Sequence, residues 1–400
     1  MWAQFALNVK STLFKKRGDR GKETVIFHFF TAVFFLTCFL TAPNNEAAAN
    51  KNNIEIPKNI KISTVDIPSF ENKSQRIKEV KDQQKHANMK FTFSNPDYSG
   101  LGDKFTWAKS CIIISYNYGE IYSTNISTST GKGSIARFAI DDYYKPIKKF
   151  IKKLKNHFDT LDLQTQEFID SPSHYDRLFF EGSGLGWQGK SSMMLSPSIG
   201  PWQLIGNLYV EMKFETPVAK SYSCGNCNMC QISCPTGALD NEYKIDSRKC
   251  ISYWLQSPEI IPHEIRTKIA NRFYGCDDCL TSCPPGQNKY ISIKQTKEVD
   301  LEKIINMDKD NLISKFEWFY VPQRNGDYLK RNAIIALANN PDEKSHELFI
   351  KLLDSDSDII RLYSIWALWR IGMLDKVNEE SFIKKEVSSD VKKEFERLKK

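Results

Sequence analysis

The sequence has little excess charge of either sign. Its 56 lysines and arginines stand against 48 aspartates and glutamates, which leaves a net charge of +8 over 400 residues. An excess this small helps to attract a polyanion without identifying one, so charge alone excludes no class of partner. Hydrophobic residues make up 41% of the chain, which is enough for a sizeable core, and the length predicts two or three domains.

Cysteine is nearly absent outside one short stretch. Cys38 and Cys111 stand apart, and the other eight of the ten cysteines fall between residues 224 and 283. Disulfide scaffolds are typically short secreted domains without a core, so this distribution argues against one and favours metal ligation. Cys111 has no cysteine partner at metal-ligand spacing and begins the β-branched run CIIISYN. That run predicts a buried strand in which Cys111 is a core residue.

The clustered cysteines form two runs. The first, from Cys224 to Pro235, reads C-x2-C-x2-C-x3-C-P, and the second, from Cys276 to Pro284, reads C-x2-C-x3-C-P. In bacterial ferredoxins such runs hold two [4Fe–4S] clusters, and the fourth cysteine of a run ligates the other cluster. The second run lacks its first cysteine, and Cys250 is the nearby thiol left to replace it. The predicted ligands are Cys224, Cys227, Cys230 and Cys283 for cluster 1 and Cys234, Cys250, Cys276 and Cys279 for cluster 2.

Zinc is the alternative occupant, since it also accepts four thiolates. Zinc ligands usually come as pairs, however, and not as C-x2-C-x2-C-x3-C-P. Two clusters close enough to exchange electrons imply that single electrons pass to or from another group. A ferredoxin module needs far fewer than 400 residues, so we expect a reaction centre within residues 66 to 220.

One strongly apolar run lies near the N-terminus, from Val25 to Ala42, after several basic residues. It resembles a signal peptide or a membrane anchor, although it holds a histidine and is barely long enough to span a bilayer. Because thiolate-ligated clusters are normally assembled in a reducing compartment, we expect a cytoplasmic protein. Cleavage near Ala47 to Ala49, membrane anchoring, organelle targeting and a wrongly included upstream start codon remain alternatives.

The rest of the chain divides by composition and pattern. Residues 43 to 65 are polar and rich in Asn and Lys, which predicts a linker with the folded part beginning after it. From Tyr144 to Phe158, five apolar residues share one helical face and lysines surround the other, which predicts an amphipathic helix. Its basic side is either a solvated face or a phosphate-contacting ridge. Near the C-terminus, Ala333-Ile334 and Ser364-Ile365 begin matching motifs 31 residues apart, as in helical hairpins of the HEAT type.

Five motifs together resemble the epoxyqueuosine reductase family. They are Ile169-Asp-Ser171, Gly184-Leu-Gly-Trp187-Gln-Gly-Lys190, the first cysteine run continued to Ala238, Arg248-Lys-Cys250-Ile-Ser-Tyr253 and Tyr274-Gly-Cys276-Asp-Asp-Cys279. The helical tail around Arg331-Asn332-Ala333 resembles that family too. The resemblance covers roughly residues 100 to 375, and the shared order and spacing make chance agreement implausible.

The resemblance implies an α+β protein and a tRNA-modifying enzyme. Such an enzyme reduces the epoxide of the modified wobble base to queuosine, using cobalamin fed by the two clusters and an external one-electron donor. The implied domains are an N-terminal extension (1–65), an α/β cobalamin-binding reductase domain (66–215), a ferredoxin-like domain (216–295) and HEAT-like helices (296–400). We expect a monomer. No D-x-H-x-x-G run is present, and the family holds its corrinoid base-off between the first two folded domains.

The resemblance also implies roles for individual residues. Asp170 matches the family's proton donor, although an aspartate before Pro172 is by itself typical of a helix N-cap or a turn. As a general acid it would need a pKa raised by burial. The implied cofactor-binding residues are Arg137, Asp142, Gly184, Gly186, Trp187 and Lys190. The glycines would allow close approach, and Trp187 could pack on the macrocycle or in a plain core.

The chain departs from the family pattern at several positions. One residue is missing before Asp142, and Tyr144 replaces a histidine. No clear counterpart of an early corrinoid-contacting arginine occurs near Pro96 to Leu101, and Pro285 stands where the family has Trp or Leu. These departures concern corrin packing more than cluster ligation.

Two other functions fit the cysteine pattern. A corrinoid reductase of a small molecule, similar to reductive dehalogenases, would share the cluster pair, but it needs neither the lysine-rich helix nor the helical tail. A non-catalytic electron carrier, tethered through residues 25 to 42, would hold clusters without a corrinoid. A corrinoid spectrum and conversion of tRNA distinguish the three.

Overall fold

The computed structural model describes residues 54–67, 74–89, 104–119, 129–171, 174–197, 199–217, 221–285, 287 and 298–399. The apolar segment at residues 25–42 and the region of the missing arginine at 96–101 lie outside these ranges. Within them, we find no helix that combines the length and the apolar character needed to cross a bilayer.

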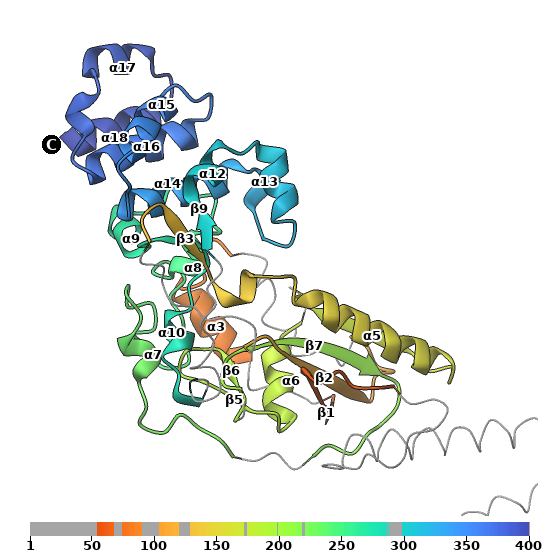
Figure 1. Cartoon of the computed structure of the whole chain (residues 1–400). Coiled ribbons are helices and arrows are strands. Elements are labelled where there is room, and N and C mark those ends of the chain that lie inside the picture. Colours follow the sequence, from red (N-terminus) through yellow and green to blue (C-terminus); the bar gives the residue numbers. More distant parts are fainter. Residues whose placement is uncertain are drawn as a thin grey trace, which may run out of the picture.

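A four-stranded antiparallel sheet forms the centre of the N-terminal part (Figure 1). Its strands, in spatial order, are β1 (Ile60–Asp66), β2 (Ser110–Asn117), β7 (Gln203–Val210) and β4 (Thr165–Ile169). The long helix α5 (Tyr144–Asp159) covers one face and the short helix α6 (Asp176–Gly182) covers the other. Helices on both faces leave the central strands little contact with water, so these strands are apolar on both sides.

Strand β2 shows how the sequence produces this arrangement. Side chains alternate between the two faces of a strand. Ile112 and Ile114 therefore pack with α5, while Cys111 and Ile113 pack on the side of α6. Cys111 is fully buried, and burial raises the pKa of its thiol. The prediction of a buried strand with a core cysteine is confirmed.

Helix α5 also matches its prediction closely. It spans Tyr144–Asp159, and its five buried residues are the ones that the periodicity selects. These are Ile147, Phe150, Ile151, Leu154 and Phe158. An apolar stripe at this spacing can be buried only on one side, so the lysines project away from the sheet.

The predicted division of the chain into domains needs two corrections. Residues 60–65, assigned to a linker, belong to β1, which pairs with β2 along its length. A second sheet joins β3 (Lys132–Ile135) to β8 (Arg272–Tyr274) and β9 (Glu298–Asp300), so its strands come from three predicted domains. Short, half-polar strands give little periodicity, and only pairing with a distant partner stabilises them.

The cysteine-rich part consists of short helices and turns. They are α7 (Met229–Ile232), α8 (Ile251–Trp254), α9 (His263–Lys268) and α10 (Asp278–Thr281). The smaller elements elsewhere are α3 (Ser74–Asp82), the 3-10 turn η2 (Arg137–Ala139), the hairpin of β5 (Trp187–Gln188) and β6 (Met194–Leu195), α12 (Leu301–Asn306), α13 (Lys309–Lys315) and the turns η3 (Pro322–Arg324) and η4 (Leu374–Lys376). Helices α7 and α10 pack against each other.

Five helices end the chain. They are α14 (Asp327–Asn339), α15 (Ser345–Leu352), α16 (Asp358–Arg370), α17 (Glu379–Lys385) and α18 (Ser389–Lys399), drawn in blue in Figure 1. The two matching motifs lie at equivalent places in α14 and α16, which pack against each other. Ala333, Ile334, Ser364 and Ile365 are all buried. Together with the sheets described above, these helices confirm the predicted mixed helix-and-sheet class.

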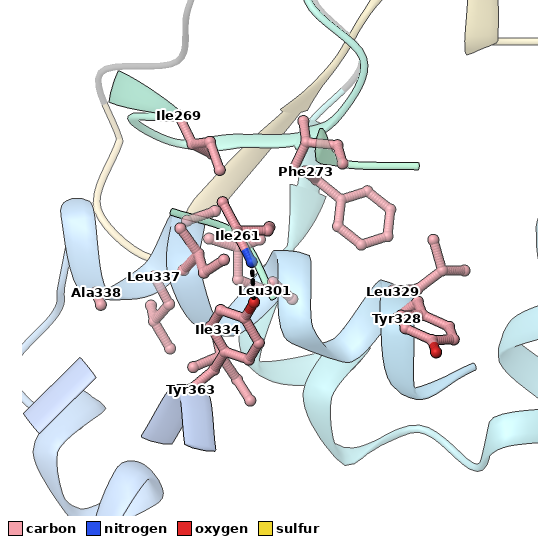
Figure 2. Close-up of a cluster of buried hydrophobic side chains, with 14 of the residues drawn as sticks. Ile261, Ile269, Phe273, Leu301, Tyr328, Leu329, Ile334, Leu337, Ala338 and Tyr363 are labelled. Atoms are coloured by element: carbon pink, nitrogen blue, oxygen red, sulfur yellow. Dashed lines mark hydrogen bonds between the residues drawn. The ribbon is translucent and has the colours of Figure 1, made fainter. Parts of the chain in front are cut away.

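One apolar core joins the C-terminal helices to the cysteine-rich part. Figure 2 shows part of it, with Ile261, Phe273, Leu301 and Ile334 converging from separate segments. The hydroxyl of Tyr363 accepts a hydrogen bond from the backbone N–H of Ile261 at 2.8 Å, across the same contact. The C-terminal helices thus share their core with the segment that carries the cysteines.

A buried arginine fastens α14 to the segment that follows α8. The Arg331 guanidinium donates to the carbonyls of Trp254 (3.1 Å) and Ser257 (2.7 Å), and the neighbouring Asn332 amide donates to that of Leu255 (2.8 Å). Arg331 is 1% exposed.

We expect Arg331→Ala to lower the temperature of thermal unfolding markedly. It would leave buried carbonyls without donors, at about 1–3 kcal/mol for each such group. The matched control is Arg370→Ala, which removes an exposed arginine at the end of α16 and should change the unfolding temperature little. Equal effects of the two substitutions would contradict the role of Arg331.

Candidate active site and cluster-binding cysteines

The structure brings four cysteines from three separate segments together. Burial raises the pKa of the Cys279 thiol, and the nearby Cys276, Cys250 and Cys234 raise it further. The pKa of Cys250 is likewise raised, first by burial and also by Cys234. These four are the predicted ligands of cluster 2, including Cys250, which lies outside both runs. Ligation would require the thiolate forms, which bonding to iron stabilises.

Three of the four predicted ligands of cluster 1 also lie together. Burial raises the pKa of Cys230, and Cys224 and Cys227 add to the effect. Cys283, the fourth predicted ligand, is buried and follows α10, which packs against α7. This contact joins the two runs, as the exchange of their fourth cysteines requires.

The local backbone suits iron–sulfur ligation. The N–H of Ala238 donates to Cys234 Sγ at 3.2 Å, a type of contact that tunes cluster sulfurs. Gly237, just before it, has a φ of 66°, which favours glycine. In the described part of the chain, no three His, Cys, Asp or Glu side chains are arranged to hold a single metal ion.

Asp170 directly follows strand β4 and has a left-handed backbone conformation, with a φ of 48°. Aspartate tolerates this region better than most residues, and the turn directs the chain away from the sheet toward α6. The N-cap of α6 is Tyr175, so Asp170 is a turn residue and not the cap of that helix. Its side chain is exposed, although neighbouring protein still removes enough water from the carboxyl to raise its pKa, and Lys148 opposes this shift.

Tyr144, the first residue of α5, lies near Asp170, and Asp142 lies two residues before Tyr144. Loss of hydration raises the pKa of Tyr144, and the carboxylates of Asp170 and Asp176 raise it further. Tyr144 is therefore a neutral hydroxyl at physiological pH. Asp142 Oδ1 accepts a hydrogen bond from the N–H of Tyr144 at 3.1 Å, so this carboxylate also holds the first turn of α5.

The start of α6 contributes groups that no sequence motif indicated. Burial raises the pKa of Asp176, while Arg177 lowers it and Asp170 raises it. Arg177 donates to the carbonyl of Ser192 at 2.9 Å, which ties α6 to the loop after β5. The available sequence signal was an acidic residue in the first turn of a short helix, a common pattern that does not distinguish active sites.

His174 packs next to this region as a buried, uncharged ring. Its ring stacks on Phe168 at 4.5 Å and lies 4.6 Å from Phe179, and its Nδ1 lies 3.3 Å from the hydroxyl of Tyr209. Burial lowers the pKa of His174 to about 3, so the imidazole is neutral at physiological pH. It anchors the turn that carries Asp170.

The loop of residues 184–190 is tightly packed. A Cβ on Gly186 would stand 1.8 Å from the carbonyl oxygen of Leu195, so this glycine permits the β5–β6 hairpin. Gly184 has a φ of 73°. Lys190 is buried against Glu242 at 2.7 Å, and this hydrogen bond raises the pKa of its ammonium. Both glycines and Lys190 thus have roles within the protein, and their contact with a cofactor stays a prediction.

Trp187 is the residue of this loop best suited to a bound group. Its indole Nε1 is buried and has no acceptor among the residues that the structure describes. The ring lies 5.4 Å from that of Tyr222, just before the first cysteine run. A buried donor without a partner costs free energy, and an amide of a corrinoid would supply the acceptor. On this observation the residues fit the implied cofactor.

Arg137 links the sheet domain to the second cysteine run. It is buried, its guanidinium lies 3.9 Å from the centre of the Trp202 ring, and its backbone N–H donates to the Asp277 carboxylate. Asp277 stands between Cys276 and Cys279. The hydrogen bond holds η2 against the cluster-binding segment, and the cation–π contact holds it against Trp202, just before β7.

Comparison with known proteins agrees with this geometry. Residues 223–286 match the family model of a 4Fe-4S double cluster binding domain. An epoxyqueuosine reductase of Bacillus subtilis is 30% identical over 72% of this chain and 79% of its own length. One from Francisella cf. novicida is 35% identical over 57% of this chain and 67% of the relative.

Solved structures of epoxyqueuosine reductases are similar to the fold of this chain. A crystal structure of an epoxyqueuosine reductase with an epoxyqueuosine-modified tRNA-Tyr stem loop superposes with a TM-score of 0.77 at 25% identity, covering 85% of this chain and 95% of the other. The Bacillus subtilis enzyme, solved with a catalytic aspartate loop swung out of the active site, gives a TM-score of 0.74 at 25% identity, covering 84% of this chain and 94% of the other.

Proposed function

This chain belongs to the epoxyqueuosine reductase family of oxidoreductases, and we propose from that premise that it reduces epoxyqueuosine to queuosine at the wobble position of tRNA. The observation that carries the proposal is the joint arrangement of Asp170, Tyr144 and Asp176. They lie in one place. Arg177 ties that place to the loop after β5, and Lys190 of the same loop pairs with Glu242 in the cysteine-rich part.

The reaction converts an epoxide and two electrons with two protons into an alkene and water. The bound clusters would supply the electrons one at a time and cobalamin would bring them to the substrate, as the family implies. The chain itself must position the base, exclude water and deliver protons to the departing oxygen. The proposed ligands are the two cysteine sets given above, with Trp187, Arg137 and Asp142 toward the corrinoid.

Asp170 is the proposed proton donor. Its pKa is raised, so more of it is protonated near neutral pH than of an ordinary aspartate, as a general acid requires. The Bacillus subtilis relative was solved with an aspartate-bearing catalytic loop swung out of the active site, and Asp170 also stands on a loop, between β4 and α6. The neutral hydroxyl of Tyr144, which replaces the family's histidine, can donate a hydrogen bond to substrate or to the Asp170 carboxylate.

This role predicts a pH dependence with a definite sign. A general acid works in its protonated form, so kcat should fall as pH rises through the pKa of Asp170, by about tenfold per pH unit. Lys148 lowers that pKa. In Lys148→Gln, the alkaline decline of kcat at saturating RNA should therefore move to higher pH. An unshifted or oppositely shifted profile would exclude Asp170 as the titrating acid.

The test of the function is one anaerobic preparation. We expect the purified chain to contain about eight iron atoms and a corrinoid spectrum, and to convert epoxyqueuosine in tRNA from cells that lack the reductase. Corrinoid without conversion would favour the reductase of a small molecule. Iron without corrinoid or conversion would favour the electron carrier.

The proposal extends to the C-terminal helices and to the oligomeric state. We propose that α14 to α18 are HEAT-like helices that contribute to RNA binding, and that the protein acts as a cytoplasmic monomer. The packing of α14 on α16, with matching buried residues, supports the repeat interpretation. Gel filtration of the full chain tests the monomeric state, and RNA binding by Lys393→Gln and Arg397→Gln, which neutralise exposed cations of α18, tests the contribution of these helices.

A further inference from the structure

A groove with a basic side lies beside the proposed proton donor. It has a volume of about 700 Å³ and lies between helix α5 and the edge strand β4. Lys148, Lys152 and Lys155 line it from α5. Ile169, the last residue of β4, and Ser171 also line it, on either side of Asp170. One end of the groove therefore lies next to Asp170, the proposed proton donor.

The lysines that line the groove form one row along the helix. Lys148 and Lys152 are one turn apart, and the row from Lys148 to Lys155 is about 10 Å long. Lys148 and Lys152 are exposed, and Lys152 has no ion pair or hydrogen bond with any residue that the structure describes. An exposed ammonium without a partner is free to bind an anion.

Other charges of the helix are already satisfied or point elsewhere. Lys155 pairs with Glu167 at 2.7 Å across the groove, and Lys145 pairs with Glu317 at 3.3 Å. Asp159 also lines the groove and reduces its positive charge. Lys149 and Lys153 are exposed on the same helix but do not line it. Lys148 also faces the Asp170 carboxyl, whose pKa it lowers, so Lys152 is the lining lysine without an opposite charge among the described residues.

We propose that this groove binds the phosphate backbone of the RNA strand next to the wobble base, through Lys148 and Lys152. The inference rests on the proposed function, because the substrate base must reach Asp170 while its own strand continues past it. A strand of phosphates held along α5 would fix the direction in which the base enters. Phosphate contacts position a nucleic acid without reading its sequence.

The test compares two neutralised lysines on one helix. Binding of an anticodon stem-loop RNA to the anaerobically prepared full chain is measured between 50 and 200 mM salt. We expect Lys152→Gln to weaken binding roughly threefold to tenfold and to reduce the slope of log K against log salt by about 1. Lys153→Gln, which makes the same charge change outside the groove, should change affinity less than twofold. Equal effects of the two would overturn the proposal.

A third variant should strengthen RNA binding instead of weakening it. Glu167→Gln removes the carboxylate that neutralises Lys155, so it should tighten RNA binding about twofold to threefold. Unchanged or weaker binding in this variant would count against the groove. Conversion of modified tRNA by the unaltered chain is measured separately. If the unaltered chain converts the tRNA but the two lysine variants bind RNA equally well, the proposal of an RNA-binding groove is wrong and the proposed function stands. If conversion fails, the function itself is wrong.

Discussion

Asp170→Asn should retain iron and corrinoid yet lose most of its turnover. Asparagine keeps the shape of the side chain and tolerates the left-handed backbone at this position, but it cannot release a proton to a departing oxygen. A positioned acid commonly contributes about 10²- to 10⁴-fold, so kcat should fall by that amount. Single-turnover conversion of epoxyqueuosine in RNA measures the loss.

The matched control for this variant is Asp162→Asn. Asp162 is also an exposed aspartate with a positive φ, at 55°, in the turn after α5. The two substitutions therefore make the same chemical change in the same backbone conformation, and Asp162→Asn should leave kcat unchanged. A near-normal rate in Asp170→Asn would exclude this residue as the essential acid, whatever its neighbours are.

The second large effect is expected at Cys250, the cysteine that lies outside both runs. Cys250→Ser should reduce the iron content from about eight to about four atoms per chain, because cluster 2 would lose a ligand. It should also abolish turnover, because electron transfer through cluster 2 would be lost. Anaerobic iron analysis and the spectrum of the reduced protein measure this. The structure places Cys250 beside Cys234 and Cys276, where its sulfur is the fourth of the group.

Cys111→Ala separates a ligand from a buried core cysteine. Cys111 is fully buried in β2, far along the chain from the two runs, and its replacement should leave all the iron in place. Some loss of stability is expected, because a small cavity is left between β2 and α6. A variant Cys250→Ser with full iron content would instead mean that another residue completes cluster 2.

The candidate site could be read from the sequence only where spacing carries the chemistry. The cysteine runs have a fixed order because the same chain must wrap a cubane, so their ligand sets are local information. Asp176 and Arg177 carry no such spacing. They reach the neighbourhood of Asp170 and Tyr144 because α5 and α6 pack on the sheet to which β4 belongs, and no pattern in the sequence records that contact.

The sequence by itself determined the cysteine pattern, the buried strand β2 and the amphipathic helix α5, because each depends on a period or a spacing within one short segment. Tertiary structure alone decided the pairing of β1 with β2, the sheet built from β8, β3 and β9, and the groove between α5 and β4. These features join segments far apart in the chain. Their stability comes from burial and hydrogen bonds between partners, and neither partner carries that information alone.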